Sequence, residues 1–267
     1  LYTMLLEGPV LALLISMTLR ASSSPEYTFA TALHIPSYLF LATIVAMFFG
    51  LTGAASEVLK DRALLKRESN AKVFVTGYVL AKALVLTGLS AVQSALFLWV
   101  GNSILEIHEM FLIYLGTMTL TAFVGVSLSL LVSVFARTER AALNMVPLLL
   151  IPQILMAGAI VRFDEMNQFI PWSAHRTDEH GRLKPGRVPL VAEFCPLRYS
   201  FETMVVDQAS KNVWERERET IQEKVDDLKE RPHLDDREFE EFKLLKMALL
   251  HIAAIGAEGP EQAKAAV

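Results

Sequence analysis

Residues 36–56 read PSYLFLATIVAMFFGLTGAAS and contain no Asp, Glu, Lys or Arg. At a rise of 1.5 Å per residue, a helix of this length crosses the hydrocarbon core of a bilayer, which is about 30 Å thick. Four further stretches are charge-free or carry a single charge, namely 1–19, 73–100, 111–135 and 141–161. Backbone groups in lipid must bond within their own segment, so these runs predict helices. Buried core helices of a soluble protein are a poor alternative, because too few polar faces remain to cover five of them.

Charge divides the chain into two parts that suit different solvents. Residues 1–161 hold 17 charged side chains, whereas the 106 residues from 162 onward hold 37. The sequence therefore predicts an all-α, polytopic membrane helix bundle over 1–161 and a water-exposed part after it. The single Cys195 excludes an internal disulfide and a cysteine-based zinc site. A net charge of −4 gives no reason to expect a nucleic-acid partner. Because the chain begins at Leu1 in an apolar stretch, we expect a fragment of a longer protein, whose first residues need not be a signal peptide.

The short loops predict the orientation, because cytoplasmic loops are enriched in Lys and Arg. The loops after the second and fourth predicted spans carry seven basic residues, and the loops at 21–35 and 101–110 carry none. We therefore expect a multi-pass protein of the cell (plasma or inner) membrane with a cytoplasmic N-terminus and with residues 162–256 on the extracytoplasmic side.

The outer part divides by composition. Residues 162–200 form a re-entrant or loop segment. Two pieces of the outer part, 167–173 and 193–206, contain aromatic residues and are expected to pack back against the spans, while 174–190 loops into water. An ordinary disordered external loop is the alternative. Helical spacing of apolar residues then predicts a charged hairpin over 201–256, broken at Arg231-Pro232, with a tail at 257–267.

Three ordered segments carry a resemblance to a known family. They are EVLKDRALLKRE at 57–68 with Tyr78, Lys82 and Gln93 beyond it, SVFARTERAALNMVPLLLIPQ at 133–153, and CPLRYSFE at 195–202. Together they resemble ABC-2 type permeases, specifically the membrane domain of G-subfamily-like half-transporters, although Asp61 stands where that pattern usually has Glu. The resemblance implies an exporter of a hydrophobic or amphipathic compound that works as a dimer in the lipid bilayer.

Two features of that family are missing from the sequence. No G-x-x-x-x-G-K-[ST] motif occurs, so this chain cannot itself bind ATP by that route. The resemblance implies that ATP and Mg²⁺ bind a nucleotide-binding domain, upstream in the same chain or separate. A sixth span, expected after the outer part, is also absent. Both absences fit a fragment that starts after the ATPase domain and ends before the last helix.

The resemblance implies roles for two groups of residues. It assigns coupling to the ATPase to a cytoplasmic connecting helix over 54–70, with Glu57, Asp61, Arg62, Arg67 and Glu68. It assigns the translocation pathway to Thr43, Met47, Phe48, Pro147, Pro152 and Gln153. The aromatic pieces of the outer segment are expected to form a lid over the exit of that pathway, with Pro171, Trp172, Pro196, Arg198, Tyr199 and Glu202. Helical spacing alone places Glu57, Asp61 and Glu68 on one stripe, which also fits an ordinary solvated surface with ion pairs between neighbouring turns.

The remaining polar residues suggest no chemistry. Lys82, about ten residues into its span, either extends to the cytoplasmic interface or forms a buried pair with Glu57 or Glu68. His175 and His180 have a generic spacing for a metal site, and no catalytic constellation is present. We therefore expect no enzymatic activity in this chain. One alternative of a different functional class stays open, in which the protein is a non-transporting membrane anchor that presents the outer hairpin as a binding module.

Overall fold

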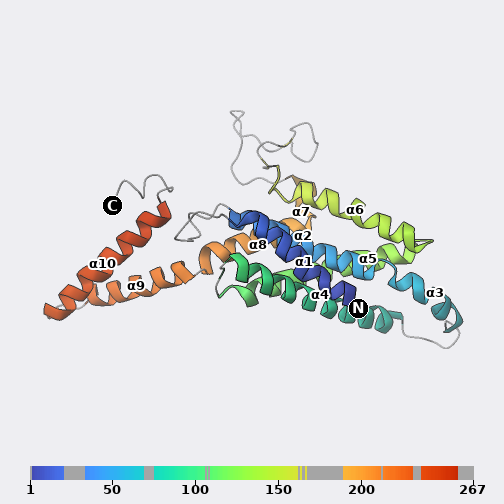
Figure 1. Ribbon diagram of the computed structural model, residues 1–267, viewed down its shortest axis with the longest axis horizontal. Helices are drawn as coiled ribbons and strands as arrows, with labels where there is room; N and C mark the ends of the chain where they lie inside the picture. The colour runs from blue at the N-terminus through green and yellow to red at the C-terminus, as the bar shows by residue number, and fades with distance from the viewer. Residues whose placement is uncertain are drawn as a thin grey trace.

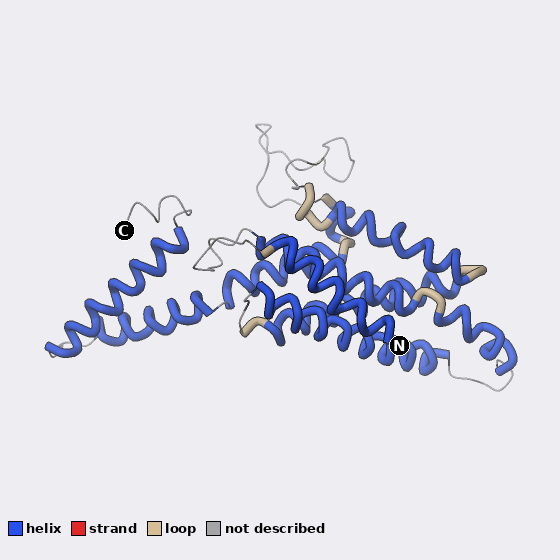
Figure 2. Tube along the Cα trace, in the orientation of Figure 1, coloured by secondary structure: helices blue, strands red, loops and turns tan. Residues whose placement is uncertain are grey.

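The computed structural model describes residues 2–20, 34–68, 75–105, 107, 109–161, 163, 166, 189–211, 213–230 and 236–257. Within these ranges every regular element is an α-helix and no strand occurs (Figures 1 and 2). The predicted all-α class is confirmed. Three helices are long and apolar enough to cross a membrane, within Ile35–Ala63, Thr76–Leu105 and Phe111–Phe135, and Met4–Leu19 is a shorter apolar helix. These helices indicate a multi-pass membrane protein.

Helices occupy the five predicted spans, namely α1 (Tyr2–Leu19), α2 (His34–Ala54), α4 (Val75–Leu105), α5 (Phe111–Phe135) and α6 (Glu139–Met156), and α2, α4 and α5 supply the three of membrane-spanning length. The α5 bounds equal the predicted ones, whereas α6 ends at Met156, five residues before the predicted end. Its N-terminus is capped by Thr138, whose side chain accepts a hydrogen bond from the Ala141 amide. Because α6 begins with Glu139-Arg140 and ends early, it falls short of the apolar length that α2, α4 and α5 reach.

Close crossing of α2 and α5 organises the bundle. Glycines face one another at the crossing, where a Cβ on Gly50 would lie 2.2 Å from the carbonyl oxygen of Ala122. A Cβ on Gly125 would lie 2.8 Å from the carbonyl oxygen of Met47. Small residues at helix contacts in membranes allow this approach of backbones. The crossing therefore depends on both glycines.

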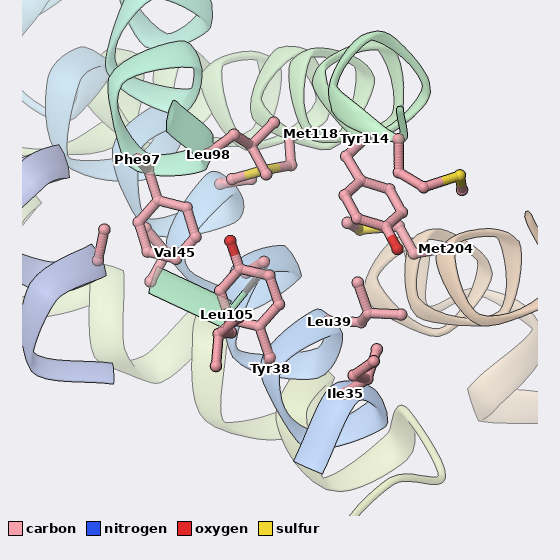
Figure 3. Close-up of a cluster of buried hydrophobic side chains, with 14 of the residues drawn as sticks. Ile35, Tyr38, Leu39, Val45, Phe97, Leu98, Leu105, Tyr114, Met118 and Met204 are labelled. Carbon is pink, nitrogen blue, oxygen red and sulfur yellow. The ribbon is translucent and has the colours of Figure 1, made fainter. Parts of the chain in front are cut away.

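The largest core cluster joins helices that are distant in sequence (Figure 3). Tyr38 of α2 stacks on Phe97 of α4, with ring centroids 6.0 Å apart. The Tyr38 hydroxyl also hydrogen-bonds to the Asn102 side-chain oxygen at 3.0 Å. Tyr114 and Met118 of α5 complete the cluster with Met204, which comes from the outer part of the chain. That part is therefore not wholly separate from the bundle.

The outer part differs from its predicted division at residue 201. After the short α7 (Leu190–Glu193), α8 (Pro196–Lys211) packs against α2, α5 and α6, so residues 201–211, the start of the predicted first hairpin helix, belong to the bundle. The hairpin itself consists of α9 (Val213–Glu230) and α10 (Asp236–Ala257), which project beyond the bundle (Figure 1). The two parts differ because Leu197, Met204 and Gln208 are buried on one side of α8, where they contact the bundle. The charge-rich sequence after α8 does not continue this buried side.

Candidate functional site

The predicted connecting helix is α3 (Glu57–Glu68), which follows α2 after only two residues. Glu57 and Asp61 are one turn apart, so their carboxylates extend from the same side of α3. Lys82 of α4 lies between them, with its Nζ 2.7 Å from Glu57 Oε2 and 2.8 Å from Asp61 Oδ2. The sequence left two alternatives for Lys82, extension to the membrane interface or an ion pair with a carboxylate, and Lys82 forms the ion pair. Glu57 is the expected partner, and Asp61 is the second one that it shows.

Two further side chains complete this cluster. The Tyr78 hydroxyl donates to Asp61 Oδ2 at 2.7 Å, and Lys60 Nζ lies 2.9 Å from Glu57 Oε1. Tyr78 and Lys82 are themselves one turn apart on α4, so two turns of one helix contact two turns of the other. The Lys82, Glu57 and Asp61 side chains are 21%, 23% and 30% exposed. We call the four residues that join the two helices, Glu57, Asp61, Tyr78 and Lys82, the α3–α4 latch. Arg67 is exposed, and the side chain of Glu68 lies outside the described residues.

A second set of contacts joins α3 to the end of α5. The hydroxyl of Ser133 accepts hydrogen bonds from the backbone amides of Val58 and Leu59, at 3.1 and 3.2 Å. In the opposite direction, Arg62 Nη2 donates to the backbone carbonyls of Val134 and Ala136, at 2.7 and 2.9 Å. We call this pair of contacts the reciprocal cap. Sequence reasoning selected Arg62 but missed Ser133, because residues more than 70 positions apart give no spacing signal.

The predicted pathway residues do not share one surface of the subunit. Thr43 and Met47 are fully buried, and Phe48 is partly buried among core residues. On α6, Pro147 and Pro152 are exposed, and Gln153 is partly buried. The side-chain oxygen of Gln153 is buried with no hydrogen-bond partner among the described residues. Pro147 and Pro152 thus lie at the surface of the subunit, while Thr43 and Met47 lie inside it.

The described residues of the predicted lid lie on or next to the start of α8. Pro196 is its first residue, Arg198 and Tyr199 lie in its first turn, and Glu202 lies on the next turn. Arg198 has a side chain only 14% exposed, and its guanidinium lies over the rings of Tyr199 and Phe163, at 4.8 and 5.6 Å from their centroids. Its Nη2 lies 3.6 Å from Glu202 Oε2. Pro171 and Trp172 lie outside the described residues.

Further contacts hold α8 on the bundle. Thr121 of α5 hydrogen-bonds to Ser200 at 2.6 Å, and the Tyr114 hydroxyl hydrogen-bonds to the Gln208 side chain. The Cys195 thiol lies 3.4 Å from the carbonyl oxygen of Gln153. Burial raises the pKa of this thiol, so the protonated form is favoured. The segment 193–206 therefore packs against α2, α5 and α6, while 167–173, the other piece of the predicted lid, lies outside the described residues.

Comparison with known proteins gives the family. No curated protein and no solved structure matches the chain significantly. The family model described as ABC-2 type transporter matches residues 2–176, which include all three helices of membrane-spanning length, α3 and α6. The match covers more than half of the sequence and agrees with the helical membrane architecture. The chain therefore belongs to the ABC-2 type transporter family, as a membrane-domain permease component without an ATPase domain in its described part.

Proposed function

We propose that this chain is the permease of an ATP-driven transporter of the G-subfamily-like half-transporter type. It works as a dimer and exports a hydrophobic or amphipathic compound. ATP and Mg²⁺ bind a nucleotide-binding domain outside this chain, which supplies the hydrolysis. The N-terminus and α3 lie on the cytoplasmic side, and α9 and α10 lie on the other side.

The attachment of α3 is the observation that carries this proposal. A short, charged helix that merely covered a surface would need only contacts along itself, such as the pair between Lys60 and Glu57. Instead, α3 is bound to α4 through Lys82 and to α5 through Ser133 and Arg62. A force applied to α3 by a cytoplasmic ATPase would therefore act on two helices of the bundle at once. This is the arrangement that coupling requires.

The surface of α6 supports the dimer. Leu143, Leu148, Ile151 and Leu155 are between 46% and 62% exposed. Pro147 and Pro152 lie among them and are exposed too. An apolar surface of this kind suits lipid or a second subunit equally, but prolines remove backbone hydrogen bonds that a neighbouring helix can satisfy. Substrate passing between two subunits would meet these residues, together with Gln153.

Charge reversal on α3 tests the proposal. The full-length transporter, with its nucleotide-binding domain, is reconstituted in proteoliposomes. We would then measure ATP hydrolysis and the uptake of the amphipathic dye rhodamine 6G by those proteoliposomes in which the transporter is oriented inside-out. Glu57→Lys and Arg67→Glu should each lower dye transport and dye-stimulated hydrolysis severalfold with little change in expression.

Lys224→Glu, on the exposed surface of α9, is the matched control and should have no effect. If both α3 reversals transport the dye as well as the parent protein does, α3 is a solvated surface and has no coupling role. If the parent protein hydrolyses no ATP and moves no dye, the function as a membrane anchor for the α9–α10 hairpin takes its place.

A further inference from the structure

We propose that Ser133 and Arg62 form a joint that carries the displacement of α3 into the turn between α5 and α6, separately from the α3–α4 latch. The inference rests on the proposed function and deepens it, since it assigns positioning roles to two residues. Neither residue contacts substrate or nucleotide in this proposal. Their role is to make the α3 helix and the end of α5 move together.

The first half of the joint is an N-terminal cap supplied by another helix. The first amides of an α-helix have no partner within the helix, and the residue just before the helix usually accepts from one of them. Ser56 occupies that position in α3, and its carbonyl accepts from the Lys60 amide. The amides of Val58 and Leu59 nevertheless bond to the hydroxyl of Ser133, which is fully buried on α5. The start of α3 is thus completed by α5.

The second half works in the opposite direction. The last carbonyls of a helix also lack partners within it, and a basic side chain nearby can satisfy them. Arg62 of α3 supplies one nitrogen to the carbonyls of Val134 and Ala136, at the end of α5. Each helix therefore completes the terminus of the other. Separating α3 from α5 would break four hydrogen bonds and leave the buried Ser133 hydroxyl without these two donors, so joint movement is favoured.

The position of the joint decides where the movement goes. Only residues 136–138 connect α5 to α6, and Thr138 already caps α6. Figure 1 shows α3 at the same end of the bundle as this turn. A displacement of the α5 terminus is therefore passed to the start of α6, the helix that carries Pro147, Pro152 and Gln153. The latch, by contrast, acts on α4 through Lys82.

A cap with a purely structural role would stabilise the protein equally with and without nucleotide. The joint predicts a difference between the two states. We would measure it with pairs of spin labels in the full-length transporter in lipid nanodiscs, without nucleotide and with Mg²⁺ and the non-hydrolysable analogue AMP-PNP. One pair, at Ala63 and Leu131, reports on the distance from α3 to α5. The other, at Asn144 and Val85, reports on the movement of α6 against α4. All four positions are exposed.

In the parent protein, nucleotide should shift the α6–α4 distance and leave the α3–α5 distance unchanged. In Ser133→Ala and in Arg62→Gln, the α3–α5 distance should become nucleotide-dependent, and the shift in the α6–α4 distance should fall by at least half. The Arg62 side chain is exposed, so its replacement does not disturb the core even if Ser133→Ala does. Arg62→Lys, which retains a donor, should recover part of the α6 shift.

Two control variants make the same substitutions, serine to alanine and arginine to glutamine, at positions outside the joint. Ser127→Ala lies on α5, where the hydroxyl bonds to the Phe123 carbonyl in its own helix, and Arg140→Gln lies in the first turn of α6. Both should behave as the parent does. The joint is refuted if both test variants keep the full α6 shift and a constant α3–α5 distance while the parent responds to nucleotide. A parent without any nucleotide-dependent shift would overturn the proposed function as well.

Discussion

Replacement of Gly50 by alanine tests the α2–α5 crossing that places Thr43 and Met47 inside the subunit. The added Cβ would lie 2.2 Å from the carbonyl oxygen of Ala122 and 2.9 Å from the amide nitrogen of Val126. Both are backbone atoms, so no side-chain rotation relieves the contact. Since an ordinary contact begins at 3.4 Å, the two helices must separate by about 1 Å locally.

The magnitude follows from two opposing effects. Overpacking of a well-packed contact costs about 1–3 kcal/mol, and a clash with backbone belongs at the upper end of that range. Alanine offsets this by about 1 kcal/mol, because it is a better helix former than glycine. We expect a net destabilisation of about 2 kcal/mol. For a chain of this size that lowers the melting temperature by roughly 4–8 °C.

The assay is thermal unfolding of the purified protein in detergent, followed by tryptophan fluorescence. Gly53→Ala on α2 and Gly116→Ala on α5 are the matched controls, because a Cβ at either position meets no atom within 4 Å. Both should melt at or slightly above the parent temperature. If Gly50→Ala melts no lower than Gly53→Ala, the close crossing of α2 and α5 is refuted.

Three further predictions concern the latch, the topology and the outer segment. Lys82→Met leaves the carboxylates of Glu57 and Asp61 facing each other and should destabilise the protein by about 1–3 kcal/mol, less than for a fully buried pair because all three groups are partly exposed. Lys60→Met, at a lysine that is 51% exposed, should cost under about 1 kcal/mol by the same melting assay, and equal losses would contradict the latch. Cysteines introduced at Ser69, which lies outside the described residues, and at Ser103 should react with an impermeant maleimide from opposite sides, with Ser69 cytoplasmic; labelling of both from outside would end this topology. Trypsin added outside should cut readily in the stretch rich in Gly, Pro and charge, at Arg176, Arg182 and Arg187. It should cut slowly at Arg198, whose side chain is 14% exposed within α8. Equal rates at all four sites would show that α8 is not packed.

The membrane helices were predictable because their signal is local. A span must be long and apolar whatever it contacts, so the charge-free run at 111–135 gives the α5 bounds directly. The ion pair of Lys82 with Glu57 could also be anticipated from the sequence. A lysine close to the end of a span needs either water or a carboxylate, and Glu57 precedes it by a short charged segment.

The reciprocal cap and the place of α8 were not predictable in this way. Ser133 is one of several serines in a charge-free run, and nothing in its neighbourhood shows that its hydroxyl serves α3. The burial of Met204 and Gln208 likewise depends on α5 and α2. Pairings across such separations are set by tertiary packing. The helical spacing of apolar residues runs on from 201 to the break at Arg231-Pro232, so it gave no sign that 201–211 packs on the bundle and does not belong to the solvated hairpin.

Burial of Cys195 makes the natural sequence convenient for chemical work. Reagents such as maleimides react with the thiolate, and a thiol that is both covered by protein and raised in pKa presents little of that form near neutral pH. A single cysteine introduced on any exposed helix would then carry nearly all of the reagent, without prior removal of the native one. Site-directed labelling within these 267 residues can therefore start from the unaltered sequence, with the contact between Cys195 and Gln153 left intact.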